Sequence, residues 1–185
     1  MKHTAIALVA TFAVVLASAD SVKTQQSAEP LPVPGYEAAR DLPGAHELPN
    51  PDTDYKVVFS VGQDSKNANE IHQMLPAIAL YVNTLAKYKV PASHRHIVVM
   101  FHQRSADFDI ILNNDAYKTR YEGRENPNTA LIHALKQAGV DFRACGQGLF
   151  ARKIDPKDVN PDIQIDLWAM TSMINLQMKG YVRVG

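Results

Sequence analysis

The chain has 185 residues, of which 46% are hydrophobic, and its 19 acidic side chains balance its 19 lysine and arginine side chains. This balance gives no reason to expect a nucleic acid or an anionic membrane surface as a partner. A chain with one cysteine cannot form an internal disulfide, so that thiol is buried, paired with another chain, or reactive.

Residues 1–19 have the pattern of a secretory signal peptide. Lys2 and His3 precede an apolar run from Ala5 to Leu16, and Ala17-Ser18-Ala19 forms a small-residue cleavage site. The run is too short to span a bilayer, so we expect no membrane span in the mature chain. We predict that the protein is periplasmic or secreted.

Residues 20–54 contain six of the eleven prolines and show neither helical nor strand periodicity. We predict an extended, poorly ordered tether; the alternative is an arm that packs along a partner subunit. The remaining residues, 55–185, are enough for one compact domain.

Two apolar runs, Tyr55–Val61 and His96–Phe101, predict strands that are buried on both faces, as in a parallel sheet. A helix is expected between them. Because proline is tolerated in a first helical turn, Pro76 places the helix start near Met74, unless the helix begins near Asn69 and kinks. Its apolar stripe consists of Ile71, Leu75, Ile78, Val82 and Leu85.

A short helix is expected around residues 108–112, followed by a polar loop. Asn126-Pro127 then supplies a cap and a first helical residue, and Gly139 ends that helix. A strand over Val140–Ala144 follows, then a turn at Gly146-Gln147-Gly148 and a brief helical turn. The alternation of strands and helices predicts an α/β fold with right-handed crossovers.

The C-terminal part predicts a strand at Ile163–Ile165, a helix at Leu167–Met178 and a final strand at Tyr181–Val184. This helix is apolar around most of its circumference. A small domain cannot cover such a helix alone, so we predict that it forms a subunit interface.

Cys145 follows the strand Val140–Ala144, and the carboxyl ends of strands are where α/β sheets place reactive groups. Backbone N–H groups of the following turn and the charge of Arg152 would favour a thiolate; the alternative is a buried structural cysteine. His102 follows the strand His96–Phe101 and shares the sheet edge with Cys145 if the two strands are neighbours. It is a candidate acid or base, or else a loop histidine that faces solvent.

Other polar residues give weaker signals. His94 and His96 share a strand face, but two histidines without a third ligand favour solvated surface over a metal site. Ser60, Gly62 and Asn67 border the same expected cleft and are consistent with ordinary loop chemistry. The sequence contains no P-loop, GxGxxG, CxxC or GxSxG motif, so nucleotide, dithiol and serine hydrolase functions lack support.

Residues 55–185 resemble the DsrE/DsrF-like sulfur-carrier family. The similarity rests on the strand end VVMFH, on LNNDAYKTRYEGRENPNTALIHALKQAGV, on FRACGQGLFARKIDP and on IQIDLWAMTSMINLQMKGYVRV. It implies a three-layer α/β fold with a mostly parallel sheet and helices on both faces, and a homo-oligomer, trimeric or hexameric. It also implies that Cys145 accepts sulfur as a persulfide and passes it on, without metal or organic cofactor. One departure is Gln103, where relatives often have glycine.

We therefore predict an exported sulfur carrier, or sulfurtransferase-like protein. Cys145 holds the persulfide, Arg152 stabilises its anion and His102 assists. The donor and acceptor are other proteins. The alternative is a non-enzymatic oligomeric binding module that uses the same cleft, in which Cys145 is structural or redox-sensing.

Overall fold

A computed structural model describes residues 30–62, 69–102 and 106–185. The predicted signal peptide, residues 1–19, and Asn67 lie outside these ranges. The strands are β1 (Tyr55–Val61), β2 (Arg95–Phe101), β3 (Asp141–Cys145), β4 (Ile163–Asp166) and β5 (Val182–Val184). The α-helices are α1 (Met74–Lys87), α2 (Asn114–Arg120), α3 (Thr129–Gln137), α4 (Gly146–Arg152) and α5 (Ala169–Met178). The 3₁₀ helices are η1 (Ala92–His94), η2 (Ala106–Ile111) and η3 (Pro156–Asp158).

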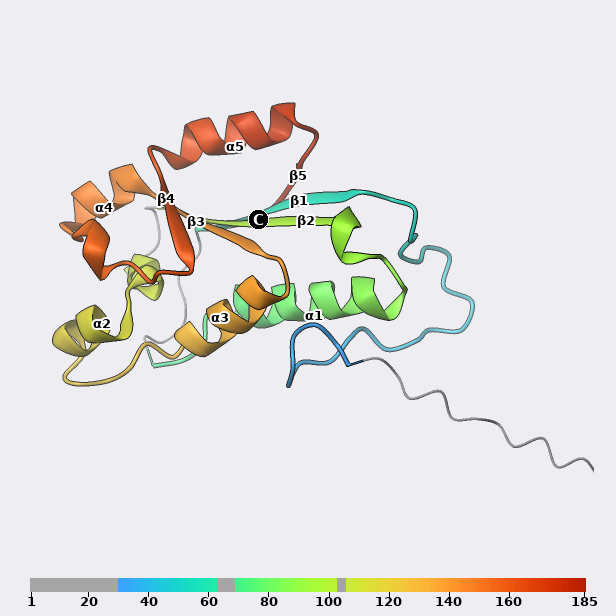
Figure 1. Ribbon diagram of the computed structural model, residues 1–185, viewed down its shortest axis with the longest axis horizontal. Coiled ribbons are helices and arrows are strands. Elements are labelled where there is room, and N and C mark those ends of the chain that lie inside the picture. Colours follow the sequence, from blue (N-terminus) through green and yellow to red (C-terminus); the bar gives the residue numbers. More distant parts are fainter. Residues whose placement is uncertain (1–29, 63–68, 103–105) are drawn as a thin grey trace, which may run out of the picture.

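The strands form one parallel sheet in the order β4-β3-β2-β1-β5. The five carboxyl-terminal residues of both β1 and β2 are buried, as their apolar runs predict. Figure 1 shows α1 and α3 on one face of the sheet and α5 on the other. The predicted α/β fold, with a parallel sheet between helices, is confirmed.

Helix α1 begins at Met74, so the start without a kink is correct. Leu75, Ile78, Val82 and Leu85 of the predicted stripe are all buried. Ile71 precedes the helix and is 40% exposed. The helical part of the stripe therefore covers one face of the sheet.

Helix α5 begins at Ala169, two residues later than predicted, because Trp168 has extended backbone angles. The helix connects β4 to β5, which lie at opposite edges of the sheet. The connection that contains α5 therefore crosses one whole face of the sheet. No helix in the described part of the chain is long and apolar enough to cross a membrane.

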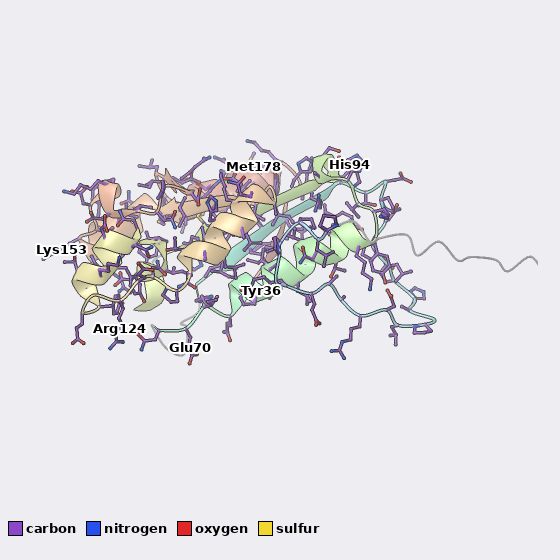
Figure 2. The ribbon with its side chains drawn as sticks, turned by 60° about the horizontal axis from the view of Figure 1, so that its bottom comes forward. Tyr36, Glu70, His94, Arg124, Lys153 and Met178 are labelled. Atoms are coloured by element: carbon purple, nitrogen blue, oxygen red, sulfur yellow. The ribbon has the colours of Figure 1, made fainter. Side chains whose placement is uncertain are left out.

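Residues 30–54 contain no regular element, but they do not form the loose tether that we predicted. Val33 is fully buried, and its N–H donates to Oδ1 of Asn83 on α1 at 2.9 Å. The Asn83 amide donates to the carbonyls of Val33 and Tyr36, at 2.9 and 2.8 Å. Lys87 forms an ion pair with Asp41 at 2.8 Å. This arm therefore packs along α1 of its own chain, where Figure 2 places Tyr36.

Helix α2 lies where we predicted a polar loop. Asn113 caps it, because its side chain accepts a hydrogen bond from the N–H of Ala116 at 2.9 Å. Tyr117 and Tyr121 stack on each other with ring centroids 4.3 Å apart. The tyrosines supply the apolar face that the sequence pattern did not reveal.

Asn126 is not the cap residue of α3, which begins at Thr129 after Asn128, although its Oδ1 accepts a hydrogen bond from the Asn128 N–H at 3.0 Å. Its side chain amide also donates to the carbonyls of Ile110 and Leu112, at 2.9 and 2.8 Å. Asn126 therefore joins the loop before α3 to the end of η2. A cap was predicted because a local pattern cannot show contacts with residues fourteen and sixteen positions away.

Candidate functional site

Cys145 ends β3 and immediately precedes α4. Gly146 and Gly148 are residues of this helix, and so the predicted glycine turn is incorrect. A Cβ on Gly146 would lie 2.9 Å from the carbonyl oxygen of Asp166 and 3.2 Å from that of Leu167. Glycine is therefore what lets α4 begin this close to the end of β4.

The sulfur atom of Cys145 lies at the beginning of α5. The N–H of Ala169, the first residue of that helix, donates to Sγ at 3.3 Å. An N–H donor at a helix start stabilises a sulfur that is anionic, as in a thiolate. Cys145 is only 2% exposed, so a reagent reaches the sulfur only if neighbouring groups move.

Three polar residues occupy consecutive strands at this edge of the sheet. Phe101 pairs with Ala144, so His102 follows β2 at the level of Cys145. Cys145 pairs in turn with Asp166 on β4. Adjacent strands lie about 4.8 Å apart, so the backbones of His102, Cys145 and Asp166 form a short row. The prediction that His102 and Cys145 share a sheet edge agrees with this register.

The ring of His102 leans toward β1 rather than toward β3. Its Nε2 lies 2.9 Å from Oγ of Ser60, and the ring covers Gly62 so closely that a Cβ there would overlap it. Arg183 of β5 also donates to Oγ of Ser60, at 3.3 Å. Ser60 and Gly62, which we treated as ordinary loop residues, therefore set the position of the imidazole.

Arg152 is the last residue of α4, at the opposite end of the helix from Cys145. Seven helical residues rise about 10 Å, so the two backbones are well separated. The donor that the structure brings to the sulfur is a backbone N–H, that of Ala169. Sequence reasoning missed it because the two residues are 24 positions apart.

Arg143 is a cation near this site that sequence reasoning overlooked. Residues two apart in a strand point to the same side, which places Arg143 and Cys145 on one side of the sheet. The Arg143 guanidinium bonds to Asp141 at 2.6 and 2.9 Å and lies 3.6 Å from Asp166. Burial alone lowers the pKa of Arg143, but the two carboxylates together hold it above its usual value. The alternation of side chains along β3 is the sequence signal that could have placed Arg143 on the same side as Cys145.

A small hollow of about 230 Å³ lies beside the cysteine, between α4 and β4. Gly146, which follows Cys145 in the chain, and Asp166, which pairs with Cys145 across the sheet, contribute to the wall of this hollow. The remaining lining is mostly apolar, from side chains such as Leu149 and Ile165. The site therefore combines an amide donor, an ion-pair cluster and an apolar hollow at one sheet edge.

His94 and His96 contact different parts of the arm. Nδ1 of His94 lies 2.9 Å from the carbonyl oxygen of Pro51, and Nε2 of His96 lies 3.5 Å from Oδ1 of Asp54. Residues 30–62, 69–102 and 106–185 contain no group of three histidine, cysteine or acidic side chains that could hold a metal ion.

Comparison with known proteins identifies a family and similar solved structures. Residues 56–184 match the DsrE/DsrF-like family, a span of more than half of the chain. The curated proteins contain no match. Among solved structures, MTH1491 from Methanobacterium thermoautotrophicum, a protein of unknown function, is 17% identical, with a TM-score of 0.44. That similarity covers 71% of this chain and 100% of MTH1491.

Proposed function

Because the chain belongs to the DsrE/DsrF-like family, whose function is related to sulfur relay, we propose that it carries sulfur as a persulfide on Cys145. The observation that supports this proposal is the N–H of Ala169 at 3.3 Å from Sγ. This donor stabilises Sγ as a thiolate, the form that attacks a sulfur donor and that is released when the sulfur is passed on.

The transfer involves two exchange steps. The Cys145 thiolate attacks the outer sulfur of a donor persulfide, the donor S–S bond breaks, and its electron pair leaves with the donor thiolate. An acceptor thiolate then attacks the outer sulfur of the Cys145 persulfide and releases the Cys145 thiolate. Sulfane sulfur moves without net oxidation, so the chain needs no second cysteine and no redox cofactor.

In this proposal the side chains around Cys145 have different roles. His102, at the same level on the neighbouring strand, exchanges protons with the incoming and leaving thiols after its ring turns from Ser60. Arg152 remains the proposed partner of the negative charge on the outer sulfur of the persulfide, which lies beyond Sγ. Arg143 and Asp166 hold the ends of β3 and β4 together at the site.

The proposal includes export and self-association. The pattern of residues 1–19 supports secretion to the periplasm or beyond, where donor and acceptor proteins would meet the carrier. Met170, Ile174 and Met178 of α5 are 54%, 49% and 81% exposed and lie at spacings of four. Large apolar side chains in such a row are typical of a subunit interface, so we propose a homo-oligomer built on α5.

Intact-mass measurement tests the persulfide directly. After incubation with inorganic polysulfide and removal of excess reagent, the mature protein should gain about 32 mass units for one sulfur atom, and dithiothreitol should remove them. Cys145→Ser is the variant that must not gain the mass. An unmodified wild type, or an adduct of the same size on Cys145→Ser, would contradict the proposal.

The burial of Cys145 favours a second candidate, a non-enzymatic binding module in which this cysteine is structural. Iodoacetamide labelling at neutral pH separates the two. A carrier requires that the native thiol be labelled while the chain stays folded. A structural cysteine is labelled only after unfolding, and that result would favour the binding module.

A further inference from the structure

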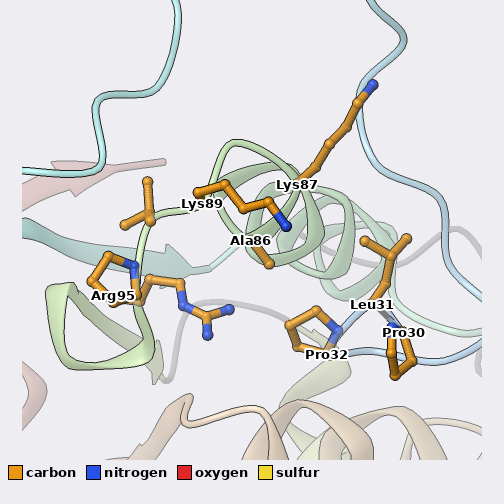
Figure 3. Close-up of a pocket in the computed structure, with 9 residues that line it drawn as sticks. Pro30, Leu31, Pro32, Ala86, Lys87, Lys89 and Arg95 are labelled. Atoms are coloured by element: carbon orange, nitrogen blue, oxygen red, sulfur yellow. The ribbon is translucent and has the colours of Figure 1, made fainter. Parts of the chain in front are cut away.

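A pocket of about 420 Å³ lies at the amino edge of the sheet, away from Cys145. It is bounded by the arm, by the end of α1 and by the start of β2, as Figure 3 shows. Its volume is in the range of small-molecule sites, about 300–1,000 Å³. Among the described residues that line it, Lys87, Lys89 and Arg95 are cations and none is acidic. The pocket is therefore suited to a negatively charged ligand.

Arg95 is the lining residue whose hydrogen-bonding state most favours such a ligand. Nε and Nη1 of its guanidinium are buried, and neither has a hydrogen-bond partner in the described part of the chain. A guanidinium keeps its charge and carries only donors, so leaving buried donors unpaired is costly. Burial also lowers the pKa of Arg95. Figure 3 shows the guanidinium pointing into the pocket toward Pro32.

The two lysines contribute differently. Lys87 points away from the pocket in Figure 3, and its Nζ is engaged by Asp41 and by the carbonyl of Ala39, both at 2.8 Å. The Lys89 ammonium reaches the pocket beside Ala86. Arg95 therefore supplies the charge on which a ligand would bind.

The walls are apolar and held in place. Pro30, Leu31 and Pro32 form one side, and Val90 and Pro91 form part of the other. The arm wall is fixed because the next residue along the chain is the buried Val33, which is hydrogen-bonded to α1. Prolines and a fixed wall lose little conformational freedom on binding, which favours a preformed site.

We propose that this pocket binds a small organic carboxylate, with its charged group at Arg95 and its apolar body against the proline wall. One guanidinium with unpaired donors matches one carboxylate, and the apolar lining matches a short hydrocarbon chain. The site is separate from the cysteine. Arg95 begins β2, a strand about 20 Å long, whereas Cys145 lies at the carboxyl edge. Figure 2 shows His94, before β2, and Lys153, after α4, at opposite ends of the molecule.

Titration of the full mature chain with sodium hexanoate, followed by NMR at constant ionic strength, tests the proposal. The backbone signals of Val90 and the Nε–H signal of Arg95 should shift in a saturable way. Acetate, which lacks the apolar body, and inorganic phosphate should bind at least several-fold more weakly. Hexanoate should also raise the melting temperature, because it binds only the folded state.

Arg95→Gln should weaken hexanoate binding roughly tenfold to a hundredfold, because a hydrogen bond to a charged group is lost. Arg95→Lys keeps the charge and should recover part of the affinity. Arg124→Gln changes an exposed arginine outside the pocket and is the matched control. Since Arg95→Gln removes two buried donors, Nε and Nη1, that have no partner among the described residues, its unliganded stability should not fall.

Three results would overturn the proposal. The first is the absence of a saturable shift on addition of hexanoate to the wild type. The second is hexanoate binding to Arg95→Gln, still folded by its NMR spectrum, that is as tight as binding to the wild type. The third is binding of acetate or phosphate as tight as that of hexanoate, which would show a non-selective anion site in which the apolar wall contributes nothing.

Discussion

Asn83 provides the clearest test of how the arm is held on the domain. Its fully buried side chain makes three hydrogen bonds, one from the Val33 N–H and two to the carbonyls of Val33 and Tyr36. At about 1 kcal/mol each, their loss in Asn83→Ala costs about 3 kcal/mol. The higher helix propensity of alanine returns about 0.6 kcal/mol. The expected net destabilisation of the docked arm is therefore about 2–3 kcal/mol.

Amide hydrogen exchange measures this effect at the arm. Exchange of the Val33 N–H should accelerate roughly 30- to 150-fold in Asn83→Ala, since about 1.4 kcal/mol corresponds to a factor of ten. Amides in the centre of β2 should change less, because the arm can detach without unfolding the sheet. Trypsin cleavage after the exposed Arg40 should also become faster.

Asn175→Ala is the matched control, because Asn175 is an exposed asparagine in α5. Its substitution brings the same gain in helix propensity without the loss of those three hydrogen bonds, so it should leave Val33 exchange unchanged. If Val33 exchanges as slowly in Asn83→Ala as in the wild type, Asn83 does not hold the arm, and the reasoning is refuted.

Three further predictions concern the rest of the fold. Gly146→Ala should destabilise the protein by about 1–3 kcal/mol in urea unfolding, because its Cβ would meet backbone oxygens at 2.9 and 3.2 Å; unchanged stability would show that α4 is not tightly fitted. Tyr121 should ionise last in an absorbance titration, because burial and Asp109 raise its pKa from 10.0 to about 12, and Tyr121→Phe should remove that step. Because the folded state favours the neutral phenol, this contribution to stability is complete below pH 10 and declines as the pH rises toward about 12. Ile174→Glu should lower the mass measured by light scattering, whereas Gln177→Glu, at another exposed position of α5, should not; equal masses would place the subunit interface elsewhere.

Local sequence was sufficient where one element carries its own pattern. The apolar run that became β1 gave the bounds Tyr55–Val61, and Pro76, which is tolerated in a first helical turn, gave a start of α1 near Met74. Both signals lie within one element, so reading them does not require knowledge of neighbouring elements. Local signals failed at α2, where a short polar helix depends on its Asn113 cap and on packing of Tyr117.

The candidate site likewise combines features that local sequence gives with features that only the fold gives. Placing Cys145 at a strand end required only the run that precedes it, and the sequence also put His102 at the end of another strand. The direction of the His102 ring depends on Ser60 and Gly62, which are 42 and 40 positions earlier in the chain. The sequence offered Arg152 as the partner of the sulfur, whereas the chain fold brings the N–H of Ala169 to it.

The sequence by itself determined the strands, most of the helices, the family and the position of the single cysteine in the α/β pattern. Tertiary structure decided that the arm docks on α1, that Gly146 lies within a helix, and that Arg95 faces a pocket with unpaired donors. The physical reason is that periodicity and capping act within about four residues of chain. Strand order and crossovers, by contrast, bring together groups that are tens of residues apart, and the contacts among those groups define both sites.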